Sequence, residues 1–422
     1  MKLNWRKIVI ASLFLSVGVT AAETTRSPME WTAVHTNAIA QWKSANQAPS
    51  GVVVDVATRT VRILAEATGI GPDDVLEFFA IGPLSDRAYE SAFVTVASPA
   101  VIAEACAQIG LPRGVAPDPL LARMWPAGEK VSLSAVVVAG GARKSFEELL
   151  SDQQEQTEGR ILNQPLAYTG GARDAAGGVI AATNIPCAVF ALYNHGPSLF
   201  QLNGAFDQSS AYGRFRLREK FAAGTLLELV VRWDGRLTVK NRCVELTATN
   251  AAEVLASLRD DAKKFEVFAQ VAYGSDVTVA KAAELGEALS LVDGSGVKMN
   301  GAAEGEFFYR AFLPDLAWRQ RAGRLFQPFE IHLAADGTRS FVFVEEDWSG
   351  EGLDPILKPR ATPFKEWREV PALIAQTGEQ GAKVSVAFVF APKTMSVAAI
   401  RPIVRTLMPR INTFYVFGEE DR

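Results

Sequence analysis

The chain has 422 residues, with 43 Lys and Arg against 47 Asp and Glu, and 48% of its residues are hydrophobic. This length allows two or three domains, each with a core of its own, because a domain usually holds about 150 residues. Charged residues make up 21% of the chain and Gly and Pro are present in ordinary numbers, which excludes a wholly disordered or collagen-like protein. The slightly acidic balance argues against a nucleic-acid binder, which needs a basic patch to displace counterions from phosphates.

The first 22 residues have the pattern of a secretory signal peptide. A cationic start holds Lys2, Arg6 and Lys7, an apolar run follows, and Thr20-Ala21-Ala22 offers small side chains for cleavage before Glu23. The alternative is a retained membrane anchor. The apolar stretch 8–22 has 15 residues, whereas a bilayer-spanning helix needs about 20. We therefore expect cleavage, a periplasmic or secreted location and no stable transmembrane span.

Cleavage would leave 40 basic and 47 acidic residues, a net charge of −7. The three cysteines, Cys106, Cys187 and Cys243, lie far apart without a C-x-x-C pair. Metal and iron–sulfur sites need clustered soft ligands, so neither these nor any other cofactor is expected. Two interpretations of the cysteines stay open: buried free thiols, or one disulfide with one free thiol.

The apolar pattern then predicts elements in chain order. Residues 23–50 form an N-terminal helix and linker, because apolar side chains recur there at helical spacing. Residues 51–215 form a β-rich domain with one clear helix, which Ser98 caps and Pro99 begins. Ser145 and Glu148 make a capping box for a short helix. The expected strands of this domain are a hairpin over 52–64 and single strands at 75–81, 92–96, 131–138, 178–183 and 187–192.

The second half of the chain repeats one pattern, in residues 216–300 and 301–422. Each copy reads strand, Asp-Gly turn, strand, helix, strand, helix, strand, with the turns at 234–235 and 336–337. A linker is expected at 293–301, and a Gly- and Pro-rich loop at 349–363. The predicted fold class is α+β and multidomain: a β-rich N-terminal domain followed by two small α/β two-layer sandwiches, each with its helices on one face of a mixed sheet.

Residues 51 to about 215 resemble the uncharacterised bacterial YdjY-like domain. The resemblance rests on Val52-Val53-Val54-Asp55, Tyr89-Glu90-Ser91, Ser98-Pro99, Tyr168-Thr169-Gly170-Gly171 and the stretch from Ala191 to Leu199. Some members of that family are fused to ferredoxin-type modules. This chain lacks the cysteines for such clusters, so electron transfer is not implied.

Residues from about 226 to 292 and 328 to 417 look like the periplasmic domain of the ExbD/TolR biopolymer-transport family. The similarity rests on the Asp-Gly hairpin, the strand-helix order, and the turns Tyr273-Gly274-Ser275-Asp276 and Ala391-Pro392-Lys393-Thr394 before each second helix. Proton-coupled members have a transmembrane helix with an aspartate, and stretch 8–22 has no acidic residue. The resemblance thus implies dimerisation and contacts with envelope partners or cell wall, without proton coupling.

The β-rich domain also holds the residues with the best claim to chemistry. Tyr193, Asn194 and His195 stand where a strand runs into a turn, and Asp207 follows within reach of a folded loop. A neutral histidine beside a carboxylate could act as a general base or bind a metal. The remaining candidates, expected near this site, are Tyr168 and Glu90.

A purely structural role is the alternative interpretation for several of these residues. The turn at His195 is also explained by a histidine and an asparagine that satisfy backbone groups. His332, in a strand, is expected to be structural or exposed, as is His35. The carboxylates Glu345-Glu346-Asp347 alternate between two faces of a strand, so we expect solvated edge charge there and no cation site.

These patterns together predict an exported cell-envelope binding or scaffold protein that is non-catalytic, in a biopolymer-transport-like assembly without its own proton-coupling helix. Its partners would be envelope proteins or cell-wall polymer, with a homodimer through the ExbD/TolR-like domains and no nucleic acid. The alternative is an enzyme or a metal-dependent carbohydrate-binding module in the YdjY-like domain that uses His195 and Asp207. The sequence holds no established catalytic motif.

Overall fold

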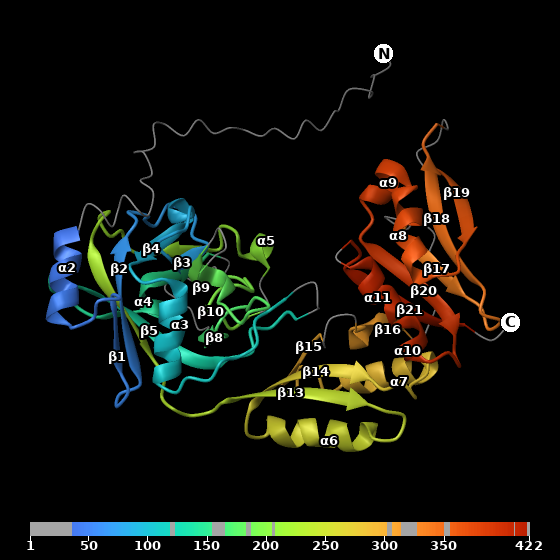
Figure 1. Cartoon of the computed structure of the whole chain (residues 1–422), viewed down its shortest axis with the longest axis horizontal. Coiled ribbons are helices and arrows are strands. Elements are labelled where there is room, and N and C mark those ends of the chain that lie inside the picture. The colour runs from blue at the N-terminus through green and yellow to red at the C-terminus, as the bar shows by residue number, and fades with distance from the viewer. Residues whose placement is uncertain are drawn as a thin grey trace, which may run out of the picture.

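The computed structural model describes residues 36–118, 123–153, 165–182, 187–204, 207–301, 306–313, 327–349, 355–408 and 410–419. The predicted signal peptide lies outside these residues. The fold is mixed α and β with several sheets, as the sequence predicts. A β-barrel lies at the N-terminal side, a small three-stranded sheet follows it, and a larger sheet forms the C-terminal side (Figure 1). No helix within the described ranges is long and apolar enough to cross a membrane.

The N-terminal sheet closes on itself because β2 pairs with strands at both ends of the ladder. Its C-terminal half pairs with β4 on one side, while β12 runs along the other side. The ring passes in order through β2 (Thr60–Ala67), β12 (Leu226–Arg232), β5 (Glu129–Val137), β8 (Leu166–Tyr168), β10 (Phe200–Leu202), β9 (Ala188–Ala191), β3 (Phe78–Ile81) and β4 (Ser91–Thr95). Two further strands pair from the side, β1 (Val52–Asp55) with β2 and β6 (Lys144–Ser145) with β5.

Short helices and strands pack around this barrel, and some of them add side chains to its core. Helix α3 (Pro99–Gln108) starts as predicted, with the Ser98 hydroxyl accepting from Val101 N, and it adds Ile102 and Cys106 to the core. The predicted capping box of Ser145 and Glu148 is present in α4 (Phe146–Leu149). The remaining elements are α2 (Thr36–Ala45), η1 (Ala88–Glu90), β7 (Leu150–Asp152) paired with β11 (Phe215–Leu217), η3 (Ile180–Ala182) and α5 (Gln208–Ala211).

The predicted Asp-Gly hairpin of the first repeat is wrong. Strand β12 pairs with β2 and β5 in the barrel, and the next strand, β13 (Val239–Leu246), pairs in parallel with β14 (Glu266–Tyr273) in another sheet. The Asp234-Gly235 turn therefore connects two sheets, and the N-terminal unit extends beyond the expected boundary at residue 215. The hairpin of the second repeat is confirmed: β17 (Phe329–Leu333) pairs antiparallel with β18 (Arg339–Asp347).

The two halves of the C-terminal region nevertheless share a strand order. The first runs β13, α6 (Ala251–Ala262), β14, α7 (Val279–Ser290) and β15 (Val297–Asn300), and its parallel strands lie in the order β13-β14-β15. In the second, β17, β20 (Val386–Pro392) and β21 (Thr413–Glu419) are likewise parallel neighbours in the order β17-β20-β21. Its other elements are η4 (Tyr309–Ala311), β16 (Phe312–Leu313), β18, β19 (Ile356–Pro363), η6 (Trp367–Glu369), α8 (Val370–Ala375), α9 (Gly378–Ala382), α10 (Val397–Ile400) and α11 (Pro402–Leu407).

Equivalent turns of the two halves contact each other. Val279 N donates to Met395 O at 2.9 Å, and Val397 N donates to Val277 O at 2.8 Å. These bonds flank Thr278 and Ser396, which form an antiparallel bridge and cap α7 and α10. One hydrophobic core runs through both halves, from Leu246 to Val416. The halves are therefore fused into one body, and not two separate sandwich domains.

Several predicted elements differ from those observed. The expected linker 293–301 contains β15, and Leu291 caps the end of α7. The expected loop 349–363 contains the strand β19. The single helix expected after it is broken into η6, α8 and α9. Ile180–Ala182 forms a 3-10 turn where a strand was expected. Cys106 and Cys187 are buried free thiols, as one interpretation expected, whereas the free thiol of Cys243 is exposed.

Charged groups fasten the barrel to the three-stranded sheet. The buried Glu129 carboxylate accepts from Thr238 N and Val239 N at 2.9 and 3.2 Å. Glu266 lies between Lys130, at 2.9 Å, and Lys298, at 2.5 Å. Burial raises the pKa of Glu266, but the bonds from Lys298 and Lys130 outweigh burial, so the pKa lies below its ordinary value.

Replacement of Glu266 by Gln should weaken this junction. We expect E266Q to lower the free energy of unfolding at pH 7 by about 1–3 kcal/mol, since two charged hydrogen bonds are lost. Because the native pKa is depressed, the difference from wild type should shrink as the pH falls below 4.5. Urea denaturation followed by fluorescence measures it. E284Q, which removes an exposed pair with Lys281, is the control, and equal effects of the two variants would contradict the account.

Candidate functional site

The rings of Phe78 and Tyr193 pack against His195 near one end of the barrel. The ring of His195 lies 5.8 Å from that of Phe78 and 5.6 Å from that of Tyr193. Its Nδ1 is 2.7 Å from the Ser198 hydroxyl, and Ser198 is fully buried. Burial lowers the pKa of His195 to about 4. The imidazole is therefore neutral at physiological pH and hydrogen-bonded to a hydroxyl, not to a carboxylate.

Two buried carboxylates lie beside Tyr193. Glu77 and Glu90 precede the paired residues Phe78 and Ser91 of β3 and β4, so the two strands bring them together. The pKa of Glu90 is raised by burial and by Glu77, although Arg87, 3.1 Å away, opposes this. Burial and the two carboxylates also raise the pKa of Tyr193. Gln208 donates to Glu77 at 2.9 Å.

Of the predicted site residues, Glu90 and His195 both lie near Tyr193, whereas Asp207 belongs to another group of contacts. Asp207 caps α5, where it accepts from Ser210 N and the Ser209 hydroxyl, and these bonds lower its pKa. Asn194 turns away and donates to Met124 O. Tyr168 is buried near Cys106. The pKa of Tyr168 is raised, and burial is the largest cause.

Glu77 was missed by sequence reasoning because it sits in an apolar run that predicts only a core strand. The cluster has two carboxylates, a phenol and a neutral imidazole, which suits hydrogen bonding to a polar ligand. His195 contacts the Ser198 hydroxyl and burial alone shifts its pKa, while Asp207 caps α5, so the predicted pair of His195 with Asp207 is not formed. Within the described residues, no group of three or more His, Cys, Asp or Glu side chains could hold a metal ion.

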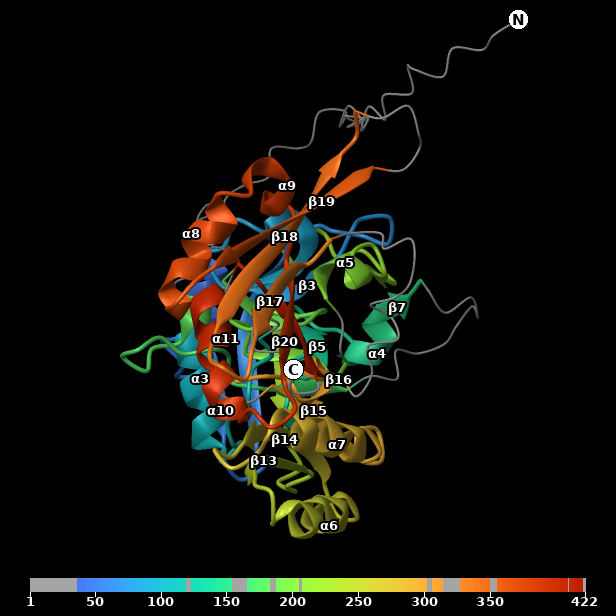
Figure 2. The ribbon, with the colours of Figure 1, turned by 90° about the vertical axis from the view of Figure 1, so that its right-hand side faces the viewer.

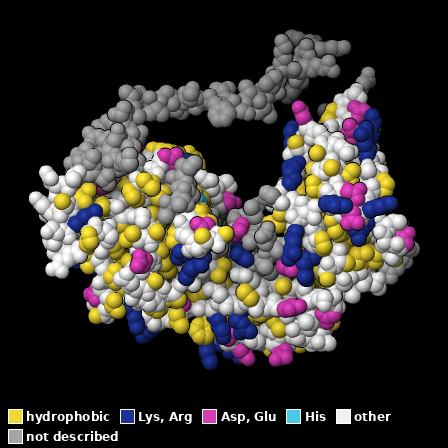
Figure 3. Space-filling view, viewed as in Figure 1, with side chains coloured by type: hydrophobic (Ala, Val, Ile, Leu, Met, Phe, Trp, Pro, Cys, Tyr) yellow, Lys and Arg dark blue, Asp and Glu magenta, His cyan; other side chains and the backbone are white. Residues whose placement is uncertain are grey.

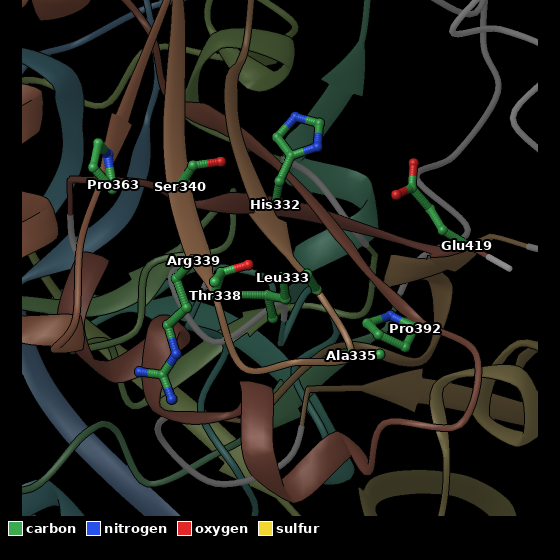
Figure 4. A pocket seen from close by; sticks show the side chains of 10 residues that line it. His332, Leu333, Ala335, Thr338, Arg339, Ser340, Pro363, Pro392 and Glu419 are labelled. Atoms are coloured by element: carbon green, nitrogen blue, oxygen red, sulfur yellow. The ribbon is translucent and has the colours of Figure 1, made fainter. Parts of the chain in front are cut away.

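A second candidate is a cavity of about 300 Å³ at one edge of the large sheet. The edge is where the parallel strands β17, β20 and β21 end (Figures 1 and 4). His332 and Ser340, directly opposite each other in the β17–β18 ladder, line it with Pro392 and Glu419. His332 was expected to be merely structural or exposed, and nothing in the sequence places Glu419 near it.

The third feature is a two-stranded ribbon that projects from this sheet. Strand β17 pairs with β18 only as far as Val342, whereas β18 pairs with β19 from Ser340 to Asp347. Residues 343–347 and 356–360 therefore extend beyond β17 as a ribbon of two strands (Figure 2). Every residue of β19 is exposed.

The two faces of this ribbon have different chemistry. Asp347 bonds Lys358 at 2.6 Å and Glu345 bonds Arg360 at 3.3 Å, so the predicted edge charges are paired across the strands on one face. On the other face, Val342, Val344 and Glu346 lie opposite Ala361, Pro359 and Leu357. Trp348 donates to Glu346 on that side and is 63% exposed, and Leu357 is 50% exposed. This face is largely apolar and open to solvent.

Comparison with known proteins adds no identification: no family model, curated protein or solved structure matches the chain. The resemblances to the YdjY-like and ExbD/TolR families therefore stay predictions. On the face in Figure 3, the described acidic and basic side chains are interspersed and form no continuous basic surface.

The environment of His195 predicts its titration. Since burial depresses the pKa to about 4, the ring should remain neutral from pH 8 down to pH 5. The chain has three histidines, so NMR of ¹⁵N-histidine-labelled protein resolves each, with H195Q as the assignment control. The burial of the neutral ring contributes stability that is lost as the pH falls below the ordinary value of 6.5. A midpoint near 6.5 would show an exposed ring and contradict this packing.

Proposed function

We propose that this protein is an exported, non-catalytic scaffold that binds an envelope partner through the apolar face of the β18–β19 ribbon. The apolar side chains of that face are Val344, Trp348, Leu357 and Pro359, with Glu346 among them, and Val342 and Ala361 continue the face onto the sheet. Trp348 and Leu357 are 63% and 50% exposed, and adjoining exposed apolar side chains on one face favour a partner that covers them. This exposed face is the observation that carries the proposal.

The register of β19 favours binding through the face over strand addition at the edge. Pro359 and Pro363 lie opposite Val344 and Ser340. Proline has no N–H, so these are the pairs that exchange no ladder bonds, and their backbone groups point outward. Two of the four outward positions of β19 therefore lack a donor. Proline is a common protection of edge strands against pairing.

A side chain from a helix bonds the other edge of the ribbon, the edge formed by β18, and this contact fixes the ribbon when no partner is bound. Gln380, on α9, accepts from Glu346 N at 3.0 Å and donates to Glu346 O at 2.8 Å. Its side-chain amide thus replaces a neighbouring strand at that position. Together with the two ion pairs across the strands, this contact holds the ribbon in one orientation, which reduces the entropy lost on binding.

The compartment and the class of partner rest on the sequence. The signal-peptide pattern supports export, and the resemblance to ExbD/TolR domains supports an envelope protein or a second copy of the chain as the partner. The absence of a histidine–carboxylate contact at His195 gives no support to the alternative hydrolytic or metal-dependent function.

Photo-crosslinking in cells tests the proposal. A benzophenone amino acid placed at Leu357 should give a discrete adduct with an envelope protein or with the chain itself. The same group at Leu237, which is 60% exposed and lies outside the ribbon, should give none. Addition of W348A should reduce the Leu357 adduct about fivefold or more, because a buried tryptophan commonly contributes 2 kcal/mol or more to an interface.

Two outcomes would contradict the proposal. One is the absence of any adduct at Leu357 while the protein is exported and folded. The other is an adduct of equal yield at Leu237, which would show nonspecific proximity. Mass spectrometry of the adduct distinguishes an envelope partner from a homodimer.

A further inference from the structure

The edge of β18 that faces away from β19 has an unpaired position at Val344. The register with β19 turns the N–H and C=O groups of every second residue of β18 toward this edge. Before Val344 on this edge, Val342 pairs with Glu330 of β17, and after it, Glu346 bonds the Gln380 side chain. Among the described residues, no group accepts from Val344 N or donates to Val344 O.

Strand β17 does not satisfy this position. Its ladder with β18 begins with Glu330 opposite Val342, and the same register, continued toward the start of β17, places Pro328 opposite Val344. Proline has no N–H, so Pro328 cannot donate to the Val344 carbonyl. A donor for that carbonyl must therefore come from another molecule or from water.

The side chain of Gln380 shows which chemical group this edge accepts. Helix α9, which carries Gln380, lies beside β18 (Figure 2). Glu346 N donates to the side-chain oxygen at 3.0 Å, and the side-chain nitrogen donates to Glu346 O at 2.8 Å. A carboxamide offers the acceptor and the donor of a peptide group. Two opposed bonds of this kind are also what a hydrogen-bonded pair exchanges in an antiparallel ladder, and Val344 presents the same two groups on the same edge.

A cavity of about 640 Å³ lies against this edge, lined by Val344, Glu346 and Gln380 among others. Trp348 and Val386 add apolar side chains to its lining. The volume falls within the usual range of ligand pockets. Residues directly opposite each other in a ladder place their side chains on the same face. A residue that pairs with Val344 therefore has its side chain on the apolar face of the ribbon, which also carries Trp348.

We propose that an extended segment of the partner adds to this edge of β18 as a short antiparallel strand. One residue of the segment donates its N–H to Val344 O and accepts a bond from Val344 N, and its side chain is apolar. The inference rests on the proposed function, because the partner is the one that covers the apolar face, and it names how that partner is held. In this mode of recognition the main-chain bonds supply affinity and the side chains supply specificity.

Titration of the ¹⁵N-labelled full chain with the peptide acetyl-Thr-Val-Thr-amide tests the inference. We expect a saturable NMR shift and about tenfold slower hydrogen exchange of the Val344 amide. The amides of Leu357 and Ala361, which point outward from the opposite edge on β19, should not respond. The peptide with an N-methyl group on its valine should bind about tenfold more weakly, because it cannot donate to Val344 O. An N-methyl group on its first threonine, whose N–H points away from β18, should leave binding unchanged.

Two proline variants test the same bonds from the side of the protein. V344P removes the N–H that has no partner in the ribbon, so it should weaken binding of the unmodified peptide about tenfold. A361P removes an outward N–H from the opposite edge and should bind as wild type does. If V344P does not fold, the two N-methyl peptides decide the question with wild-type protein.

The inference is overturned if the Val344 amide shows no saturable response, if the two N-methyl peptides bind alike, or if Leu357 and Ala361 respond in place of Val344. Its failure is distinct from failure of the proposed function. A crosslinked adduct at Leu357 with an unresponsive Val344 would keep the apolar face as the interface and reject strand addition. A responsive Val344 without any adduct at Leu357 would reject the proposed function and keep the peptide-binding edge.

Discussion

The pairing register of β18 and β19 is the constraint on which the proposed binding surface depends. Pro359 and Pro363 lie at positions that exchange no backbone hydrogen bonds between β18 and β19. The hydrogen bonds must therefore join the alternate pairs, such as Phe343 with Arg360 and Glu345 with Lys358. The bond from Phe364 N to Arg339 O at 3.1 Å continues the same alternation. This register also directs side chains: the ion pairs fall on one face, and Val344 and Leu357 on the other.

The same alternation leaves an open place within the sheet. On the side of β18 away from β19, the backbone of Val342 faces β17 and the backbone of Glu346 bonds the Gln380 side chain. The backbone of Val344 lies between these two positions, beyond the first paired residue of β17. A cavity of about 640 Å³ lies there, lined by Val344, Trp348 and Val386 among others. The apolar face of the ribbon thus adjoins a cavity, and a partner that covers Trp348 could also enter it. This continuity explains how a narrow ribbon can offer a sizeable interface.

Local signals in the sequence predicted local structure well. Ser98 and Pro99 begin α3, Ser145 and Glu148 form their capping box, and Asp336-Gly337 turns between β17 and β18. These features depend on neighbours a few residues apart. The Asp-Gly pair at 234–235 also marks a turn, but a turn signal does not tell which sheet each flanking strand joins. Strand β12 buries Leu227, Leu229 and Val231 on one face and carries Glu228 and Arg232 on the other, which suits a barrel strand with one face toward the core.

The functional sites were harder to predict because their members come from distant segments. Glu77, Glu90 and Tyr193 meet only because β3 lies between β4 and β9. His332 and Glu419 line one cavity because β17 and β21 end on the same side of the sheet. Strand β19 was expected to be a loop, since its prolines and exposed charges hide the alternation that marks a half-buried strand. Each miss reflects a long-range pairing that composition and spacing do not encode.

The most direct test of the central claim is amide hydrogen exchange of the isolated protein, resolved by residue. The account predicts slow exchange at Phe343, Glu345, Lys358 and Arg360, whose N–H groups bond across the ribbon, and fast exchange at Val344, Leu357 and Ala361, which point outward. Fast exchange at all of these residues would show that the ribbon does not form without a partner, and slow exchange at Val344 would show that its open edge is already occupied. Either result would contradict a preformed, uncovered binding surface.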